Sequence, residues 1–166
     1  MGHIRNGGGV YGRLQKRLDR FPIGAPPAPA LYEILKLLYT REEAEIASRM
    51  PIAPIGLEGI ARRTKKAPNE LRPLLDRMAD KGLVMDFVRN GKTSYMLSPT
   101  LLGFFEFAFM RVRDDIPQKE IARHMAAYAH DDPEYARSVF AGKTQSGRMS
   151  SPRRRTRAFR NGQEER

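Results

Sequence analysis

The chain has 166 residues, no cysteine, and 30 basic against 19 acidic residues, which gives a formal net charge of +11. This length suits one domain with a real core, and the lack of thiols excludes a disulfide framework, a thiolate zinc site, a catalytic cysteine and the usual ligands of an iron–sulfur cluster. The longest apolar stretch, residues 101–110, is about half a membrane span and contains Glu106. Because the N-terminus also lacks an apolar secretory segment, we expect a soluble, cytoplasmic protein without a membrane partner.

The positive charge is unevenly distributed along the chain. Residues 1–20 hold five basic residues and one acid, and residues 148–166 hold seven arginines and two glutamates. Between these ends, residues 57–97 carry nine basic residues against five acids, whereas the rest of the body is slightly acidic. A strongly basic balance indicates a nucleic-acid partner, and within the body it points to residues 57–97.

The N-terminal segment combines a basic helix with a proline-rich connector. Residues 1–9 contain three consecutive glycines and few apolar side chains, so we expect them to be disordered. Residues 10–21 predict a basic helix that packs on the body or on a partner through an apolar stripe of Val10, Leu14, Leu18 and Phe21. Four prolines in residues 22–29 predict a stiff, extended connector.

Two scaffold helices follow, at residues 31–39 and 41–50, and Thr40 is the expected N-cap of the second. Residues 51–56 predict a loop with a short strand. A helix over residues 57–64 buries Leu57, Ile60 and Ala61, and after a short turn Pro68 takes the first position of the next helix. That helix, residues 68–81, has apolar residues at Leu71, Leu74, Leu75 and Met78, and Gly82 is its C-terminal stop.

A hairpin completes this central part of the chain. Residues 83–89 and 92–97 are rich in strand-forming residues, and Asn90-Gly91 between them is the strongest short hairpin signal. Two helices followed by a hairpin describe a winged helix. We therefore predict a mostly α fold with a small β-hairpin wing, a winged helix-turn-helix flanked by additional helices.

The C-terminal third begins with an unusually apolar helix. Apolar residues cover nearly all sides of residues 101–112, so this helix is the centre of the core, a dimer interface, or both, and we expect Leu101, Phe105 and Phe109 to contribute to a homodimer. Two further helices are predicted at residues 117–128 and 133–141, with Asp132 as the N-cap of the second. The chain thus divides into a basic arm and Pro-rich linker (1–28), a winged-helix domain with flanking helices (29–147) and a disordered Arg-rich tail (148–166). The tail is either a basic segment for nucleic acid or the product of a shifted reading frame.

Part of the sequence resembles known families. The segment IARRTKKAPNELRPLLDRMADKGLV, residues 60–84, resembles the two helices and first wing strand of bacterial MarR-like and ArsR-like winged helix-turn-helix regulators. The flanks FPIGAP at 21–26, LYEILKLLYTREEAEIASRMP at 31–51 and residues 117–142 resemble the N-terminal half of bacterial proteins that join a winged helix to a 4Fe-4S ferredoxin domain. This second resemblance covers about residues 10–147, and the ferredoxin half has no counterpart in these 166 residues.

No pattern of catalytic or metal-ligating residues stands out. The GKT tripeptides at 91–93 and 142–144 lack the glycine that a phosphate loop has five residues earlier, where Asp86 and Arg137 stand. His124 and His130 are six residues apart and so nearly on opposite sides of a helix. We therefore predict a protein that is not an enzyme and has no cofactor and no metal.

Two functions remain open. As a DNA-binding, regulator-like module, the protein would use basic residues and one asparagine of the two central helices and the wing: Arg62, Arg63, Lys65, Lys66, Asn69, Arg72, Arg77, Arg89 and Lys92. On the second helix, however, Glu70 and Asp76 repel phosphate and Pro73 removes a helical hydrogen bond. These residues favour the alternative, a docking or accessory domain for a redox enzyme or a ferredoxin-type electron-transfer protein. If neither holds, the basic residues form only a solvated surface.

Overall fold

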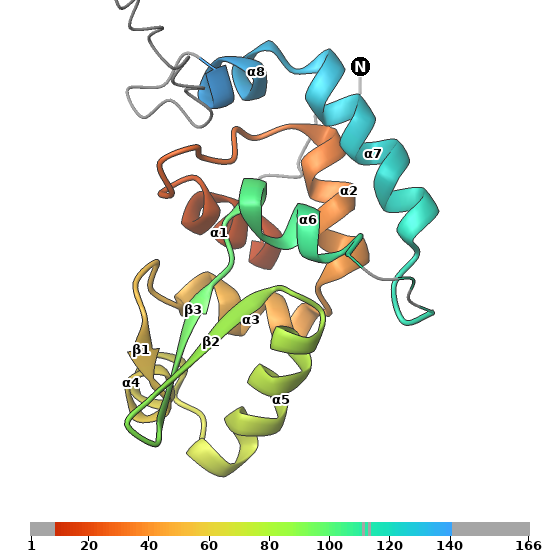
Figure 1. Cartoon of the computed structure of the whole chain (residues 1–166). Helices are drawn as coiled ribbons and strands as arrows, with labels where there is room; N and C mark the ends of the chain where they lie inside the picture. Colours follow the sequence, from red (N-terminus) through yellow and green to blue (C-terminus); the bar gives the residue numbers. More distant parts are fainter. Residues whose placement is uncertain (1–8, 111, 113, 141–166) are drawn as a thin grey trace, which may run out of the picture.

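The computed structural model describes residues 9–110, 112 and 114–140 (Figure 1). These residues form a mostly α-helical fold with one small antiparallel sheet, which confirms the predicted fold class. The helices are α1 (Gly9–Leu18), α2 (Pro29–Leu38), α3 (Arg41–Arg49), α4 (Leu57–Thr64), α5 (Pro68–Asp80), α6 (Phe105–Phe107), α7 (Gln118–Asp131) and α8 (Pro133–Phe140), with a π-helical turn at Thr100–Phe104. The strands are β1 (Ile55–Gly56), β2 (Val84–Arg89) and β3 (Lys92–Leu97). None of the described helices is long and apolar enough to cross a membrane.

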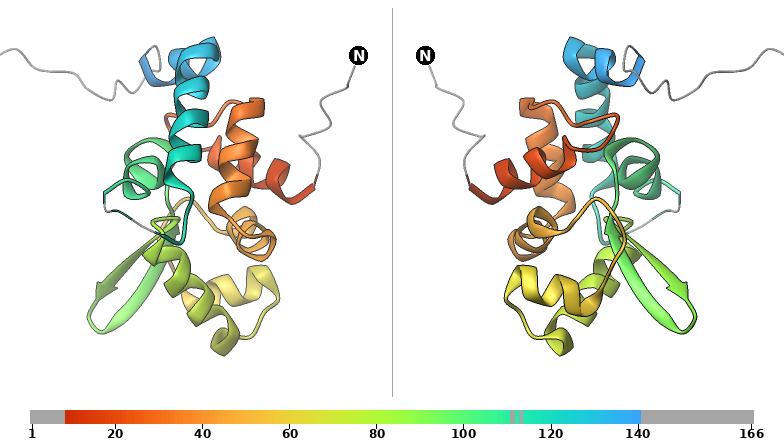
Figure 2. Two further views of the ribbon diagram at one scale, coloured as in Figure 1. Left: turned by 90° about the vertical axis from the view of Figure 1, so that its right-hand side faces the viewer. Right: turned by 90° about the vertical axis from the view of Figure 1, so that its left-hand side faces the viewer.

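The winged helix comprises α3, β1, α4, α5, β2 and β3. The sheet order is β1-β3-β2, and the hairpin register runs from Val84 opposite Leu97 to Arg89 opposite Lys92. Asn90 and Gly91 have φ of 51° and 71°, as a two-residue turn between twisted strands requires. The hairpin extends away from the helices in both views of Figure 2, as expected of a wing.

Local sequence signals set the limits of α5. Pro68 occupies its first turn, and Leu71, Leu74, Leu75 and Met78 are buried as predicted. At its end Gly82 has φ of 76°, and the N–H groups of Gly82 and Leu83 donate to the carbonyls of Ala79 and Met78 at 2.9 and 2.8 Å. This pattern is a Schellman cap, which satisfies the last carbonyls of the helix. The chain then enters β2 directly.

Helix α1 belongs to the same core as the helices that follow it. Leu14 and Leu18 are fully buried, and α1 packs mainly against α3. The side chain of Gln15 donates to the carbonyl of Ala25 at 2.7 Å, and Asp19 accepts the N–H of Ala25 at 2.9 Å. Of the two alternatives for this helix, the structure therefore has it packed on the body. Predictions for residues 1–8 and for the tail 148–166 lie outside the described residues.

The segment after β3 differs from its prediction. In place of one long helix over residues 101–112, the π-helical turn leads into the three-residue α6, and the described side chains of the segment are only partly covered. Phe104 and Phe105 are buried, with their rings 4.8 Å apart and perpendicular, whereas Phe109 and Met110 are 39% and 75% exposed. The rings of Tyr128 and Tyr135 stack at 4.3 Å near Phe105 and join α7 and α8 to this cluster.

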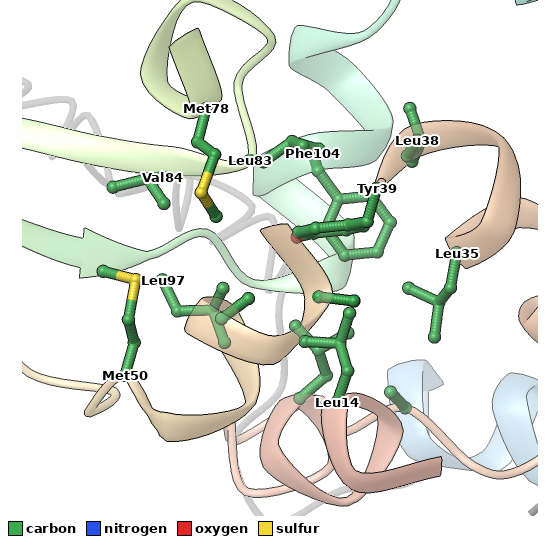
Figure 3. Close-up of a cluster of buried hydrophobic side chains, with 14 of the residues drawn as sticks. Leu14, Leu35, Leu38, Tyr39, Met50, Met78, Leu83, Val84, Leu97 and Phe104 are labelled. Atoms are coloured by element: carbon green, nitrogen blue, oxygen red, sulfur yellow. The ribbon is translucent and has the colours of Figure 1, made fainter. Parts of the chain in front are cut away.

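The main apolar cluster collects side chains from nearly every element of the domain. Figure 3 shows the ring of Tyr39 against that of Phe104, and these rings meet edge to face at 6.3 Å. Around them lie buried side chains from α1, α2, α5 and the sheet, including Leu14, Leu35, Leu38, Met78, Leu83, Val84 and Leu97. Helix α7 runs alongside α2 (Figure 1), and the Tyr128 hydroxyl donates to the carbonyl of Pro26 at 2.8 Å.

A nearly buried ion pair joins the scaffold helices to the end of α5. The Lys81 ammonium lies 2.6 Å from a Glu43 carboxylate oxygen and also donates to the carbonyl of Leu38 at 3.1 Å. The same carboxylate oxygen accepts the N–H of Thr40, whose hydroxyl in turn accepts the N–H of Glu43, so the predicted N-cap is a full capping box. The two charged side chains are only 15% and 5% exposed.

Replacing Lys81 by Met should destabilise the domain by about 3 kcal/mol, because removal of one partner leaves a buried carboxylate without its counter-charge. Chemical denaturation measures this loss. The matched control is Lys36→Met, which breaks an exposed pair with Glu33 and should cost less than about 1 kcal/mol. Equal losses of unfolding free energy in the two variants would show that the buried pair of Lys81 with Glu43 contributes no more to stability than an exposed pair.

Replacing Gly91 by Val should open the wing. A Cβ at Gly91 meets nothing within 4 Å, so the cost of about 1–2 kcal/mol or more comes from the positive φ alone. Hydrogen exchange should become faster in β2 and β3 and stay unchanged in α2. Gly56→Ala is the control, because Gly56 has equally open space but φ of −69°. Unchanged exchange in the wing of the Gly91 variant would contradict the assigned turn.

Candidate nucleic-acid interface

Three of the predicted basic residues cluster at the end of α4. Arg62 and Arg63 are exposed in its last turn, and Lys65 is exposed just after it with φ of 59°. The left-handed conformation of Lys65 ends the helix, and its N–H donates to the carbonyl of Ala61 at 2.8 Å. Arg49 of α3 donates to the carbonyl of Thr64 at 3.2 Å and so fixes this end of α4 to the scaffold.

Lys66 differs from the other predicted contacts because its charge is already paired. Its ammonium lies 2.8 Å from Glu42, and the hydrogen bond to that carboxylate raises the pKa of the Lys66 side chain. Among the nine predicted residues, Lys66 alone forms an ion pair with another described residue. Its affinity for a phosphate is therefore reduced by the competing carboxylate.

The exposed face of α5 carries both signs of charge. Asn69, Arg72 and Arg77 are exposed on it, together with Glu70, Pro73, Asp76 and Asp80. The hydroxyl of Tyr95 on β3 donates to Asp76 at 3.4 Å, and burial, followed by the nearby Asp76 charge, raises the pKa of Tyr95. Asp76 thus has a structural contact with the sheet, which accounts for an acid on this face without reference to a ligand.

The clearest convergence of predicted residues is a hollow between α4, α5 and the wing. It has a volume of about 320 Å³ and brings Arg72 of α5 together with Lys92 of β3. One acid, Glu58, also lies on its rim. Its lining consists of Gly56, Leu57, Glu58, Arg72, Gly91, Lys92, Thr93 and Tyr95. Arg77 and Arg89 are exposed but do not line this hollow, so the structure unites only part of the predicted site.

A second group of cations was not assigned to the site from the sequence. Arg13, Lys16, Arg17 and Arg20 of α1 and the loop after it line a hollow of about 240 Å³ together with Ser48. Their spacing of three, one and three residues places them on one side of a helix, away from the buried Leu14 and Leu18. This signal was visible in the sequence, but the proximity of this group to α4 was not.

Of the three residues predicted to form a dimer interface, the two whose side chains are described differ in how exposed they are. Phe105 is 4% exposed and packs against Phe104, Tyr128 and Tyr135 of its own chain, so little of its side chain is left for contact with a second copy. Its ring thereby contacts both α7, through Tyr128, and α8, through Tyr135. Phe109 remains accessible, and the side chain of Leu101 lies outside the described residues.

Comparison of the chain with models of protein families, with curated proteins and with solved structures gives no match. The fold is therefore established by the geometry alone: a winged helix-turn-helix with additional helices. Within the described part of the chain, no group of three histidine or acidic side chains is placed to hold a metal ion. The resemblances to MarR-like and ArsR-like regulators and to ferredoxin-linked proteins stay predictions.

Proposed function

We propose that the protein is a non-catalytic winged-helix module that binds duplex DNA in the manner of a transcriptional regulator. The observation that carries this proposal is the shared hollow of Arg72 and Lys92, which brings a cation of the second helix and a cation of the wing to one place. In helix-turn-helix proteins the second helix enters the major groove and neighbouring elements contact the backbone. A DNA phosphate bound in this hollow would face both Arg72 and Lys92.

The residue types on α5 suit this role. Arginine pairs with guanine and asparagine with adenine in the major groove, and Asn69 and Arg72 lie in the first half of the helix. Lys92 at the wing suits a phosphate, which it would bind without reading sequence. Pro73 deprives the carbonyl of Asn69 of its helical donor, and this local cost runs against a regular reading helix.

A second candidate is docking of a protein such as a redox enzyme or a ferredoxin-type electron carrier. A largely apolar groove of about 520 Å³ supports it, between the end of α5, the outer strand β2 and α6. Phe87 and Met110 in this groove are partly or mostly exposed. The acid Glu70 on α5 also suits a basic protein surface better than DNA. The chain has no cysteine, so any cluster would belong to the partner.

Duplex binding should depend on the shared hollow. In the full chain, Arg72→Gln with Lys92→Gln should lower the salt slope of binding by about 1.8 if both residues contact phosphates, or cost about 1–3 kcal/mol at specific sites if Arg72 reads a base. Fluorescence anisotropy with labelled duplexes at several salt concentrations measures both. The control, Lys119→Gln with Arg123→Gln, removes the same charge from exposed positions on α7. Identical curves for all three proteins would contradict DNA binding through the hollow.

We also propose a homodimer, since two-fold pairing of helix-turn-helix domains matches two half-sites. Phe109 and the adjacent Met110 are the exposed apolar side chains that support it. In sedimentation at tens of micromolar, the protein should be dimeric, and Phe109→Ser with Met110→Glu should make it monomeric. Val88→Glu on the wing is the control, because Val88 is also exposed and apolar. A monomeric wild type would refute the dimer, and a monomeric Val88 variant would move the interface to the wing.

A further inference from the structure

The four cations of the α1 segment, Arg13, Lys16, Arg17 and Arg20, form what we call the α1 basic face. They surround a hollow of about 240 Å³ whose remaining lining residue is Ser48 of α3. The opposite side of α1 holds Leu14 and Leu18, both fully buried. Because that apolar side is fixed in the core, the basic face has a defined position on the body.

One arginine of this face is held in place. The Arg17 guanidinium donates to the carbonyl of Ser48 at 3.2 Å and is partly buried, which costs it some of its hydration. Arg13 pairs with Glu45. A preoriented guanidinium loses less entropy when it binds an anion than a freely rotating one does.

The face holds more positive charge than the surrounding acids can balance. Glu45 pairs with both Arg13 and Arg49. Lys16 and Arg20 have no acidic partner in the part of the chain that the structure describes. Asp19 accepts the N–H of Ala25 instead. Folding therefore concentrates like charges here, and an anion would relieve their repulsion.

The α1 basic face continues onto α4. In Figures 1 and 2, α3 lies between α1 and α4. Arg63 lies in the last turn of α4, next to Thr64, through which α4 contacts the end of α3. Burial, and then the positive charges of Arg20 and Arg63, lower the pKa of Arg17. Arg49, at the end of α3, donates to the carbonyl of Thr64 and so joins α3 to the last turn of α4. The band thus runs from α1 across the end of α3 to the last turn of α4.

Stabilisation of the α1 helix dipole explains only part of this arrangement. Lys16 and Arg17 lie in the last turn of α1, where cations are favourable. The dipole corresponds to about half a charge and acts within about one turn. It accounts for neither Arg13, one turn earlier, nor Arg63, which comes from another helix.

We propose that Lys16, Arg17 and Arg20 of the α1 basic face, together with Arg63, bind the sugar-phosphate backbone of duplex DNA, whereas Arg13 is already paired with Glu45. The lining of its hollow includes no aromatic side chain among the described residues, and aromatic stacking is what single-strand binders use. This inference rests on the proposed function for its ligand, but it uses residues outside the hollow of Arg72 and Lys92. Binding here is independent of base sequence, because phosphates carry no sequence information directly.

The test uses the full chain and a labelled duplex of arbitrary sequence, with anisotropy measured over a range of salt concentrations. Lys16→Gln with Arg20→Gln should lower the salt slope by about 1.8, since each lost phosphate contact removes about 0.9. These exposed side chains have no described ion-pair partner, so the variant should keep the wild-type circular dichroism and melting temperature. The control is again Lys119→Gln with Arg123→Gln, and any contribution from residues 148–166 is common to all variants.

The outcomes separate this inference from the proposed function. If the Arg72 and Lys92 variant lowers the slope and the Lys16 and Arg20 variant does not, the proposed function stands and the α1 inference is wrong. If only the Lys16 and Arg20 variant lowers it, the α1 face binds DNA and the shared hollow does not. Polyglutamate that binds through Lys16 and Arg20, with no binding of duplex, would assign the face to an acidic protein and overturn the proposal.

Discussion

The contact between Lys81 and Glu43 joins the end of α5 to the scaffold helices α2 and α3. Glu43 belongs to the capping box of α3, Lys81 ends α5, and the Lys81 ammonium also meets the last carbonyl of α2. Since β2 begins three residues after Lys81, the position of the wing depends on this junction as well. A buried pair of opposite charges is directional, unlike apolar packing, and so selects one orientation of α5 from those that the leucine stripe would tolerate.

Most elements of the fold were predictable because their signals are local. Thr40 with Glu43, Pro68 at a helix start, and Asn90-Gly91 at a hairpin each act within four residues, and all are where the sequence indicated. The segment after β3 was not predictable in this way. Its apolar residues suggested a long helix, but Phe104 and Phe105 are covered by Tyr39, Tyr128 and Tyr135 from distant parts of the chain, which is a tertiary property.

The same distinction between local signals and tertiary contacts applies to the candidate site. That Arg72 is exposed on α5 follows from its place outside the buried stripe of Leu71, Leu74, Leu75 and Met78. That Lys92 flanks the wing turn follows from Asn90-Gly91. Their shared hollow, in contrast, depends on the hairpin folding back beside α4. The pairing of Lys66 with Glu42 joins residues 24 positions apart, and the contact of Arg49 with the carbonyl of Thr64 joins residues 15 positions apart. Single-sequence patterns carry no information on such distances.

Among the described residues, the strand order β1-β3-β2 leaves the outer edge of β2 unpaired, and this bears on how the protein avoids uncontrolled addition of strands. Within the described residues β2 pairs only with β3, so its outer backbone groups could template a strand from another molecule. Val88 and Phe87 on this strand would favour such stacking. Asp86 and Arg89 place charges along the same edge, and charged residues on edge strands oppose uncontrolled addition of strands. The wing therefore combines backbone groups that could pair with another strand and charged side chains, Asp86 and Arg89, that oppose such pairing.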